Sequence, residues 1–190
     1  MSRPPQYQQG NIIRSVTLTI GDTIAVGALT VPVLHNYSWS DPEEIRQPSQ
    51  DPEPVWATTT WLETLAGRQG ANVMQVDVYS RVGAPGAAYN DAYGLIAHEV
   101  MDEIESLFCG LRPGGGRFHW IPILDFTLDP DNPTDTGYCL SMQPADPSAR
   151  VGQPESRNYL GIVDGFHRVT ARLRFLMIRD MVRGAGFMTE

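Results

Sequence analysis

The closest approach to a catalytic motif in this sequence is HEVMD, at residues 98–102. In zinc-dependent proteases the related pattern HExxH places two histidines four residues apart on one helix face, where both bind the metal. Here Asp102 stands where the second histidine would be, and no third ligand is apparent. A solvated acidic helix face is therefore the favoured interpretation. A small metal-dependent hydrolase built on His98, Asp102 and a histidine from a strand is the alternative.

Few other features of the chain could carry chemistry. All 14 basic residues are arginines, so the lysine that Walker A loops and Schiff-base enzymes need is missing. The sequence contains no GxSxG motif, and the RPGGGR segment at 112–117 is interpreted as a flexible turn rather than an anion site. We expect a protein that is not an enzyme, with no catalytic residues, metal or cofactor. A small-ligand domain using Trp56, Trp61 and Trp120 is a further alternative.

Charged side chains predict two surfaces of opposite sign. Residues 87–108 carry five acids and no arginine, whereas residues 166–177 alternate arginines with apolar side chains. Guanidinium groups pair well with carboxylates across interfaces. We therefore expect the acidic helix of one subunit to meet the arginine strand of the next, a head-to-tail contact that can close a ring. The predicted interface residues are Arg168, Arg172, Arg174, Asp91, Glu99, Asp102 and Glu103.

The periodicity of apolar residues predicts the elements that carry these groups. Helical spacing runs from Asn11, as N-cap, to Val26, and again from Ala87 to Phe108. Alternating or β-branched segments predict strands. These strands lie at 29–37, 55–62, 73–81, 118–126 and 166–177, with a short one at 138–142. This order predicts an α+β fold: a mainly antiparallel sheet packed on one face by helices, with long Pro/Gly-rich loops.

The chain, 1–190, is expected to form a single domain. Its composition predicts a flexible arm at 1–10, extended loops at 38–54 and 127–158, and a C-terminal extension at 178–190. The net charge of −8 makes it a poor ligand for nucleic acid. No signal segment and no apolar run of membrane-spanning length is present, so we expect a cytoplasmic origin and no membrane partner.

In this order the elements resemble the bacteriophage tail terminator (tail completion) family. The similar segments are VPVLHNYSW at 31–39, VWATTTWLE at 55–63, MQVDVYSRVG at 74–83, the long helix that follows, and VTARLRFLM at 169–177. The QVDVY strand, which leads into a small-residue turn and a long helix, is the most telling of these. The resemblance covers about two thirds of the chain; the loops at 38–54 and 127–158 and the C-terminal extension depart from it.

The resemblance implies a structural virion protein in the neck region of a phage tail, made in the host cytoplasm. It implies a hexameric ring at the head-proximal end of the tail tube, which ends tube polymerisation and joins the tail to the head connector. Its partners would be copies of itself, the tail tube protein and the head–tail connector protein. DNA would pass through the lumen without specific binding. Another connector or neck protein of the same particle is the alternative.

Overall fold

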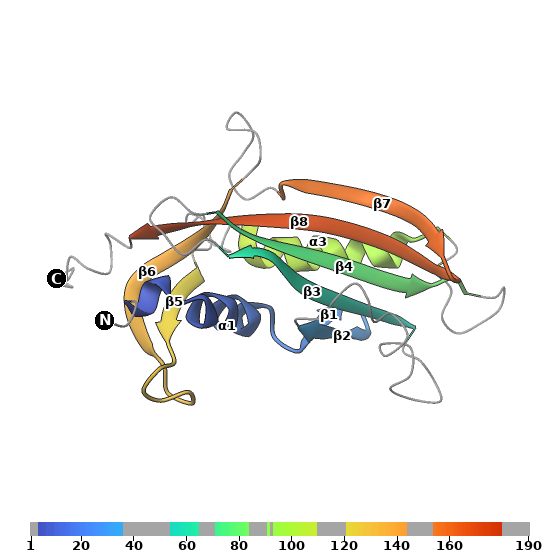
Figure 1. The fold of residues 1–190 in the computed structure, drawn as a ribbon. Helices are drawn as coiled ribbons and strands as arrows, with labels where there is room; N and C mark the ends of the chain where they lie inside the picture. Colours follow the sequence, from blue (N-terminus) through green and yellow to red (C-terminus); the bar gives the residue numbers. More distant parts are fainter. Residues whose placement is uncertain are drawn as a thin grey trace, which may run out of the picture.

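The computed structural model describes residues 4–35, 54–64, 71–83, 91, 93–109, 121–143 and 154–179. The elements follow in the order η1 (Pro5–Tyr7), α1 (Gln9–Ile20), β1 (Thr23–Val26), β2 (Leu29–His35), β3 (Val55–Thr64), β4 (Ala71–Arg81), α3 (Leu95–Cys109), β5 (Ile121–Asp125), β6 (Thr134–Gln143), β7 (Ser156–Val163) and β8 (Phe166–Arg179) (Figure 1). The fold is α+β, as the sequence predicts. No helix in this part of the chain is long and apolar enough to cross a membrane.

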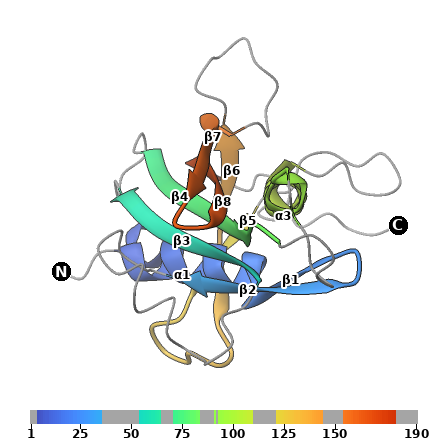
Figure 2. The same ribbon diagram turned by 90° about the vertical axis from the view of Figure 1, so that its right-hand side faces the viewer.

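The strands form one curled, mixed sheet (Figure 2). Its order is β1-β2-β3-β4-β8-β6-β5, and β7 also pairs with β8. Strand β8 is central: β4 pairs with one of its edges, while β7 and then β6 pair with successive parts of the other. The β2–β3 pair is parallel, and the other pairs between described strands are antiparallel.

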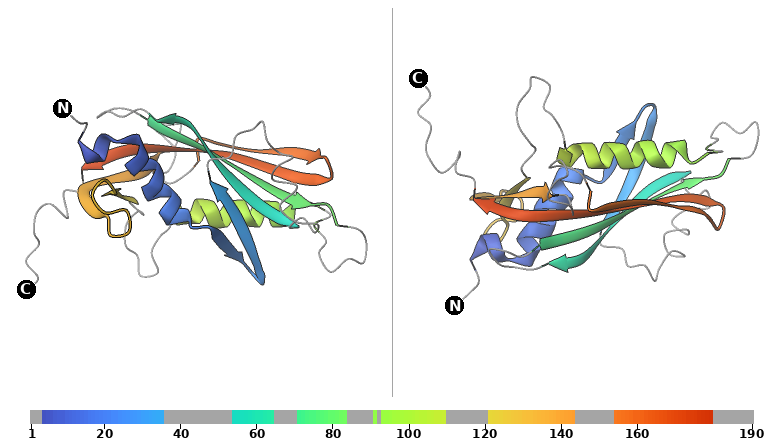
Figure 3. Two further views of the ribbon diagram at one scale, coloured as in Figure 1. Left: turned by 60° about the horizontal axis from the view of Figure 1, so that its bottom comes forward. Right: turned by 90° about the horizontal axis from the view of Figure 1, so that it is seen from above.

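The core lies between the inner face of this sheet and the two helices. Alternation along β4 and β8 turns every second side chain inward, including Val76 and Leu173. Helix α1 adds Ile12 and Val16, and α3, which runs along β4 and β8 (Figure 3), adds a row that includes Ile104. Burial of each such side chain contributes about 1.5–3 kcal/mol, so packing against the helices determines which face of the sheet is inner.

Helix α1 ends earlier than the sequence predicts. It spans Gln9–Ile20, has Gln8 rather than Asn11 at its N-cap, and ends at Gly21, whose φ is 76°. Residues 23–26 form β1 instead, and a two-residue turn joins β1 to β2. The single helix predicted over 11–26 is therefore wrong beyond Ile20. The apolar spacing continues past Gly21, but its left-handed backbone ends the helix.

Asn11 acts between elements rather than as a cap. Its side-chain oxygen accepts a hydrogen bond from the backbone N–H of Phe126 at 3.2 Å, and its amide donates to Asp125 at 3.2 Å. One turn later, Ser15 Oγ accepts from the N–H of Leu124 at 2.9 Å. Strand β5 ends the sheet, so these α1 side chains bond backbone groups that a further strand would otherwise bond.

Helix α3 begins later than predicted. It spans Leu95–Cys109, whereas the prediction began at Ala87. Gly94 has a φ of 73°, and Tyr93, whose spacing places it on the apolar face of the predicted helix, is 82% exposed. A backbone in the left-handed region at Gly94 cannot continue a helix through that residue. Of residues 84–92, only Asp91 is described.

The segments predicted as an arm, loops and an extension contain regular structure where they are described. Residues 5–7 lie in η1, and residues 9 and 10 already belong to α1. The predicted loop at 127–158 contains β6, Thr134–Gln143, and the start of β7. Strand β8 runs on to Arg179. Residues 38–53, 144–153 and 180–190 lie outside the described residues, as do His119, Trp120 and the segment at 112–117.

Candidate subunit interface

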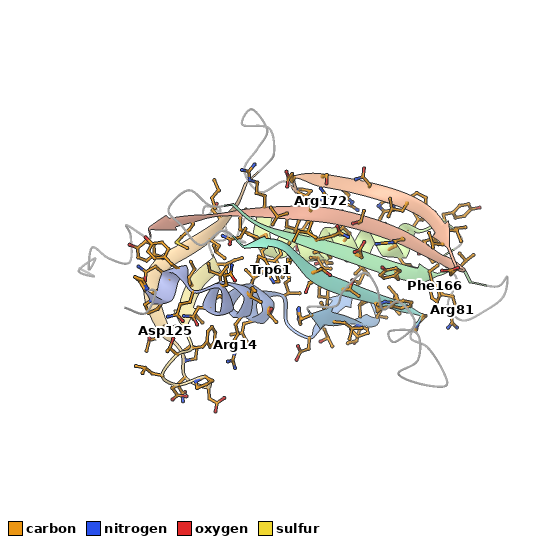
Figure 4. All side chains as sticks on the ribbon, viewed as in Figure 1. Arg14, Trp61, Arg81, Asp125, Phe166 and Arg172 are labelled. Atoms are coloured by element: carbon orange, nitrogen blue, oxygen red, sulfur yellow. The ribbon has the colours of Figure 1, made fainter. Side chains whose placement is uncertain are left out.

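The three arginines predicted to form an interface lie on one face of β8 but differ in exposure. They alternate with Val169, Ala171 and Leu173, whose side chains are buried in the core. Arg172 is exposed and Arg174 half-buried, whereas Arg168 is only 7% exposed. Arg172 is labelled in Figure 4 beside the start of β7, where it pairs with Ser156. The outer face of β8 therefore presents two arginines to solvent rather than three.

Arg168 is held inside the chain by Asp77 on the neighbouring strand β4. Its Nε and Nη2 donate to Asp77 Oδ1 at 3.1 and 2.9 Å, and Gln75 donates to Asp77 Oδ2 at 2.8 Å. The guanidinium also lies 5.3 Å from the centre of the Tyr79 ring, which stacks on Trp56. This pairing leaves Arg168 no exposed group to offer to another subunit.

The predicted acidic residues also separate into buried and exposed groups. Asp91 is only 2% exposed and accepts a hydrogen bond from Ser80 Oγ at 2.5 Å. It also accepts from the backbone N–H of Ala97 at 3.4 Å, close to the positive end of the α3 dipole. Asp91 therefore fixes the start of α3 within the monomer. The exposed acids of α3 are Glu99, Asp102 and Glu103.

An arginine that the sequence analysis did not single out pairs with this helix. Arg157 on β7 donates from Nη1 to Asp102, and the same nitrogen lies 3.5 Å from Glu105 Oε1. Its Nη2 contacts His98 Nδ1 at 3.0 Å and donates to the His98 carbonyl oxygen at 3.1 Å. Burial raises the pKa of Glu105, while Arg157 opposes that rise. Part of the acidic helix is thus neutralised within the same chain.

The geometry around HEVMD differs from that of a metal site. A guanidinium carries only donors, so His98 Nδ1 accepts from Arg157 and its lone pair is engaged there. Asp102 binds the same arginine. His167 makes a 2.6 Å hydrogen bond with Tyr159 instead of joining them. Among the described residues no three histidines, cysteines or acids are grouped to hold a metal ion. His35 lies elsewhere, bonded to Thr59 and Gly21.

Trp56 and Trp61, the two described tryptophans of the three proposed for a ligand site, do not come together. Trp56 stacks on Tyr79 at 5.1 Å and meets Phe166 edge-on at 4.8 Å, on the outer face of the sheet. Trp61 is five residues along the same strand and lies near Phe175 of the core instead. These two tryptophans therefore pack on opposite faces of the sheet.

The remaining charged groups give the chain two oppositely charged sides. Glu99 and Glu103 project from α3, which covers the inner face of the sheet. Arg172 and Arg174 project from the outer face, and no ion pair joins either of them to another described residue. Strand β7, which supplies Arg157, was missed in the sequence, although the Asp164-Gly165 turn after it is a strong hairpin signal.

Comparison of the sequence with models of known protein families gives no match, and comparison with curated proteins gives no significant match.

Proposed function

We propose that this chain is a structural virion protein, the subunit of a bacteriophage tail terminator ring. Copies assemble, six in the family that the sequence resembles, at the head-proximal end of the tail tube. The ring ends tube polymerisation and joins the tail to the head connector. In this proposal the mainly antiparallel sheet, covered on one face by helices and connected by Pro- and Gly-rich loops, is the body of the subunit.

The observation that carries this proposal is the separation of opposite charges onto two sides of one monomer. The acids of α3 and the arginines Arg172 and Arg174 lie on opposite sides of the sheet. They cannot meet within a chain, but the acidic side of one copy can meet the arginine side of the next. Such a contact joins two different patches, and repeated contacts of that kind close into rings or extend into filaments.

Other properties of the chain are compatible with a ring around DNA. With a net charge of −8, a lumen lined by this protein repels phosphates and lets DNA pass without specific binding. The proposal assigns no catalytic residue, no metal and no cofactor. The protein is made in the host cytoplasm and then located in the neck region of the virion. Its partners are the tail tube protein and the head–tail connector protein.

The proposal is tested by combining purified chain with tail tube protein. We expect rings by electron microscopy and mass photometry, and tubes that stop growing when the chain is added. The variant R172E/R174E should assemble at least about tenfold more weakly, because like charges then face each other. Adding E99R/E103R to it should restore assembly. R14E is the matched control, since Arg14 is exposed on α1, away from both surfaces.

The outcomes separate the candidate roles. A chain that stays monomeric at every concentration and leaves tube ends growing contradicts the proposal. A ring that binds the head connector but never the tube end identifies another neck protein instead. Restoration by the E99R/E103R pair shows that the two charged sides meet each other, because neither pair of substitutions alone recreates opposite signs.

A further inference from the structure

Exposed apolar side chains are concentrated at one end of the molecule. Six of the nine large hydrophobic residues that are exposed in the described part of the chain belong to the β7–β8 hairpin or precede and begin α3. We call them the end patch: Tyr93, Leu95, Tyr159, Leu160, Ile162 and Val163. They lie on both faces of the hairpin, since Ile162 pairs with His167 and Val163 pairs with Phe166. Exposed apolar side chains gathered at one end in this way mark a binding site more often than scattered residues do.

Short contacts hold the two halves of the end patch together. A Cβ at Gly94 would lie 3.1 Å from His167 Nδ1, so the start of α3 packs directly against β8. The Tyr159 hydroxyl bonds to the same nitrogen at 2.6 Å, and the Tyr159 ring lies 5.7 Å from that of His98. Phe166 and Arg81 lie at this end of the molecule, opposite Arg14 and Asp125 (Figure 4). The end patch is therefore preformed, which reduces the entropy lost on binding.

The strand edges of β5 and β7 differ in what borders them. At the β5 end, Asn11 and Ser15 of α1 bond the edge backbone groups. Strand β7, which lies off the main strand order, pairs with β8 on one side, and no further described strand pairs with its outer side. The strand contains no Lys or Pro, and after its bulge the exposed residues Ile162 and Val163 are apolar, which leaves an edge on which another chain can pair. The end patch thus lies beside an open strand edge.

The charges around the end patch indicate what binds it. Glu99 and Glu103 continue from it along α3, so the partner surface must combine apolar and cationic groups. The outer face of this same chain has that combination: Arg172 and Arg174 lie there with the half-buried Leu176. Leu62 on β3 is 41% exposed. The next residue, Glu63, pairs with Val73 of β4, and Val73 in turn pairs with Arg174 of β8, so Leu62 lies close to Arg174 along the sheet.

We propose that the end patch is the apolar centre of the contact between subunits, and that it binds the outer face of the next copy around Arg172, Arg174 and Leu62. This inference rests on the proposed ring and names the side chains that hold it together. Apolar burial supplies the affinity, while the acid–arginine pairs fix which faces meet. Because the two surfaces differ, the contact is head-to-tail.

The test uses full-length chain with aspartate at the centre of the end patch. I162D and L160D should each weaken self-association at least about tenfold in sedimentation equilibrium, because a buried aliphatic side chain contributes that factor or more. The matched control is L128D, since Leu128 is 92% exposed but lies in the β5–β6 connection. Circular dichroism should show all three variants folded, because the replaced side chains are exposed.

Cross-linking shows directly which surface of the next copy binds the end patch. I162C and L62C proteins, treated with a short bis-maleimide, should give a covalent dimer when mixed and much less when each is treated alone. Cross-linking of I162C with itself contradicts the head-to-tail contact. If I162D and L160D assemble like the wild type while R172E/R174E does not, the end patch is not part of the subunit contact, and the ring proposal is still supported. If the wild type never assembles, the ring proposal itself fails.

Discussion

The Arg157 guanidinium on β7 lies against the Asp102 carboxylate on α3, and it also reaches Glu105 and His98 of the same helix. This contact joins β7, which pairs with β8 off the main strand order, to the helix that covers the inner face of the sheet. It also means that the acidic side of α3 is partly neutralised before any second subunit arrives.

Replacing Arg157 should therefore destabilise the monomer. We expect R157M to lower the free energy of unfolding by about 1–3 kcal/mol, because His98 loses a hydrogen-bond donor and Glu105 loses the positive charge beside it in a partly buried site. Asp102 contributes little to this loss, since its side chain is 65% exposed. Urea denaturation measures the difference. R172M is the control and should stay within about 0.5 kcal/mol of the wild type; equal stability of R157M and R172M contradicts the assignment.

Glu105 should give stability a distinct pH dependence. Burial raises its pKa above the ordinary value of 4.5, against the opposing effect of Arg157. The folded chain therefore binds a proton that the unfolded chain releases, so this contribution is complete below pH 4.5 and is lost as pH rises through the folded pKa. Denaturation should be measured for the wild type and E105Q as pH rises above 4.5. The free energy of unfolding contributed by Glu105 should fall over this range in the wild type and not in E105Q. E103Q, at an exposed acid of the same helix, should retain the wild-type slope.

The buried Arg168–Asp77 pair should behave as a unit. Removing either partner leaves an uncompensated charge in a buried site, so R168M and D77V should each cost about 3–5 kcal/mol. The double variant should cost clearly less than the sum, because neither charge then remains. Chemical denaturation of all four proteins completes the cycle. Additive losses would show that the two side chains are independent, contrary to their 2.9 Å contact.

The sequence indicates the strands and helices well but says little about which polar side chains are buried. Alternation along 166–177 correctly separates core residues from arginines, yet it cannot distinguish the buried Arg168 from the exposed Arg172. That difference depends on Asp77, Tyr79 and Trp56, which reach the outer face from other strands. Periodicity describes one element at a time, and burial of its polar face depends on its neighbours.

Two further differences have local causes. Strand β7 interrupts its own alternation at Gly161, whose φ is 81°, where the register with β8 shifts. The bulge hides the period-2 pattern, although the Asp164-Gly165 turn remains as a signal. At the N-terminal end, Ile24 continues the helical spacing of Val16 and Ile20, although the helix has already ended at Gly21. Spacing alone therefore places Ile24 in the helix, whereas it lies in β1.

The α1 contacts with β5 give the last prediction. N11A and S15A should each destabilise the chain by about 1–3 kcal/mol, because the backbone N–H groups of Phe126 and Leu124 lose their acceptors. Amide hydrogen exchange at Leu124 and Phe126 should accelerate in the corresponding variant. S106A is the control: Ser106 is an exposed serine whose hydroxyl bonds only within α3, so its removal should change neither stability nor exchange at β5. Unchanged exchange in N11A and S15A would mean that α1 does not protect this edge. Faster exchange would show that the α1 side chains protect the β5 edge.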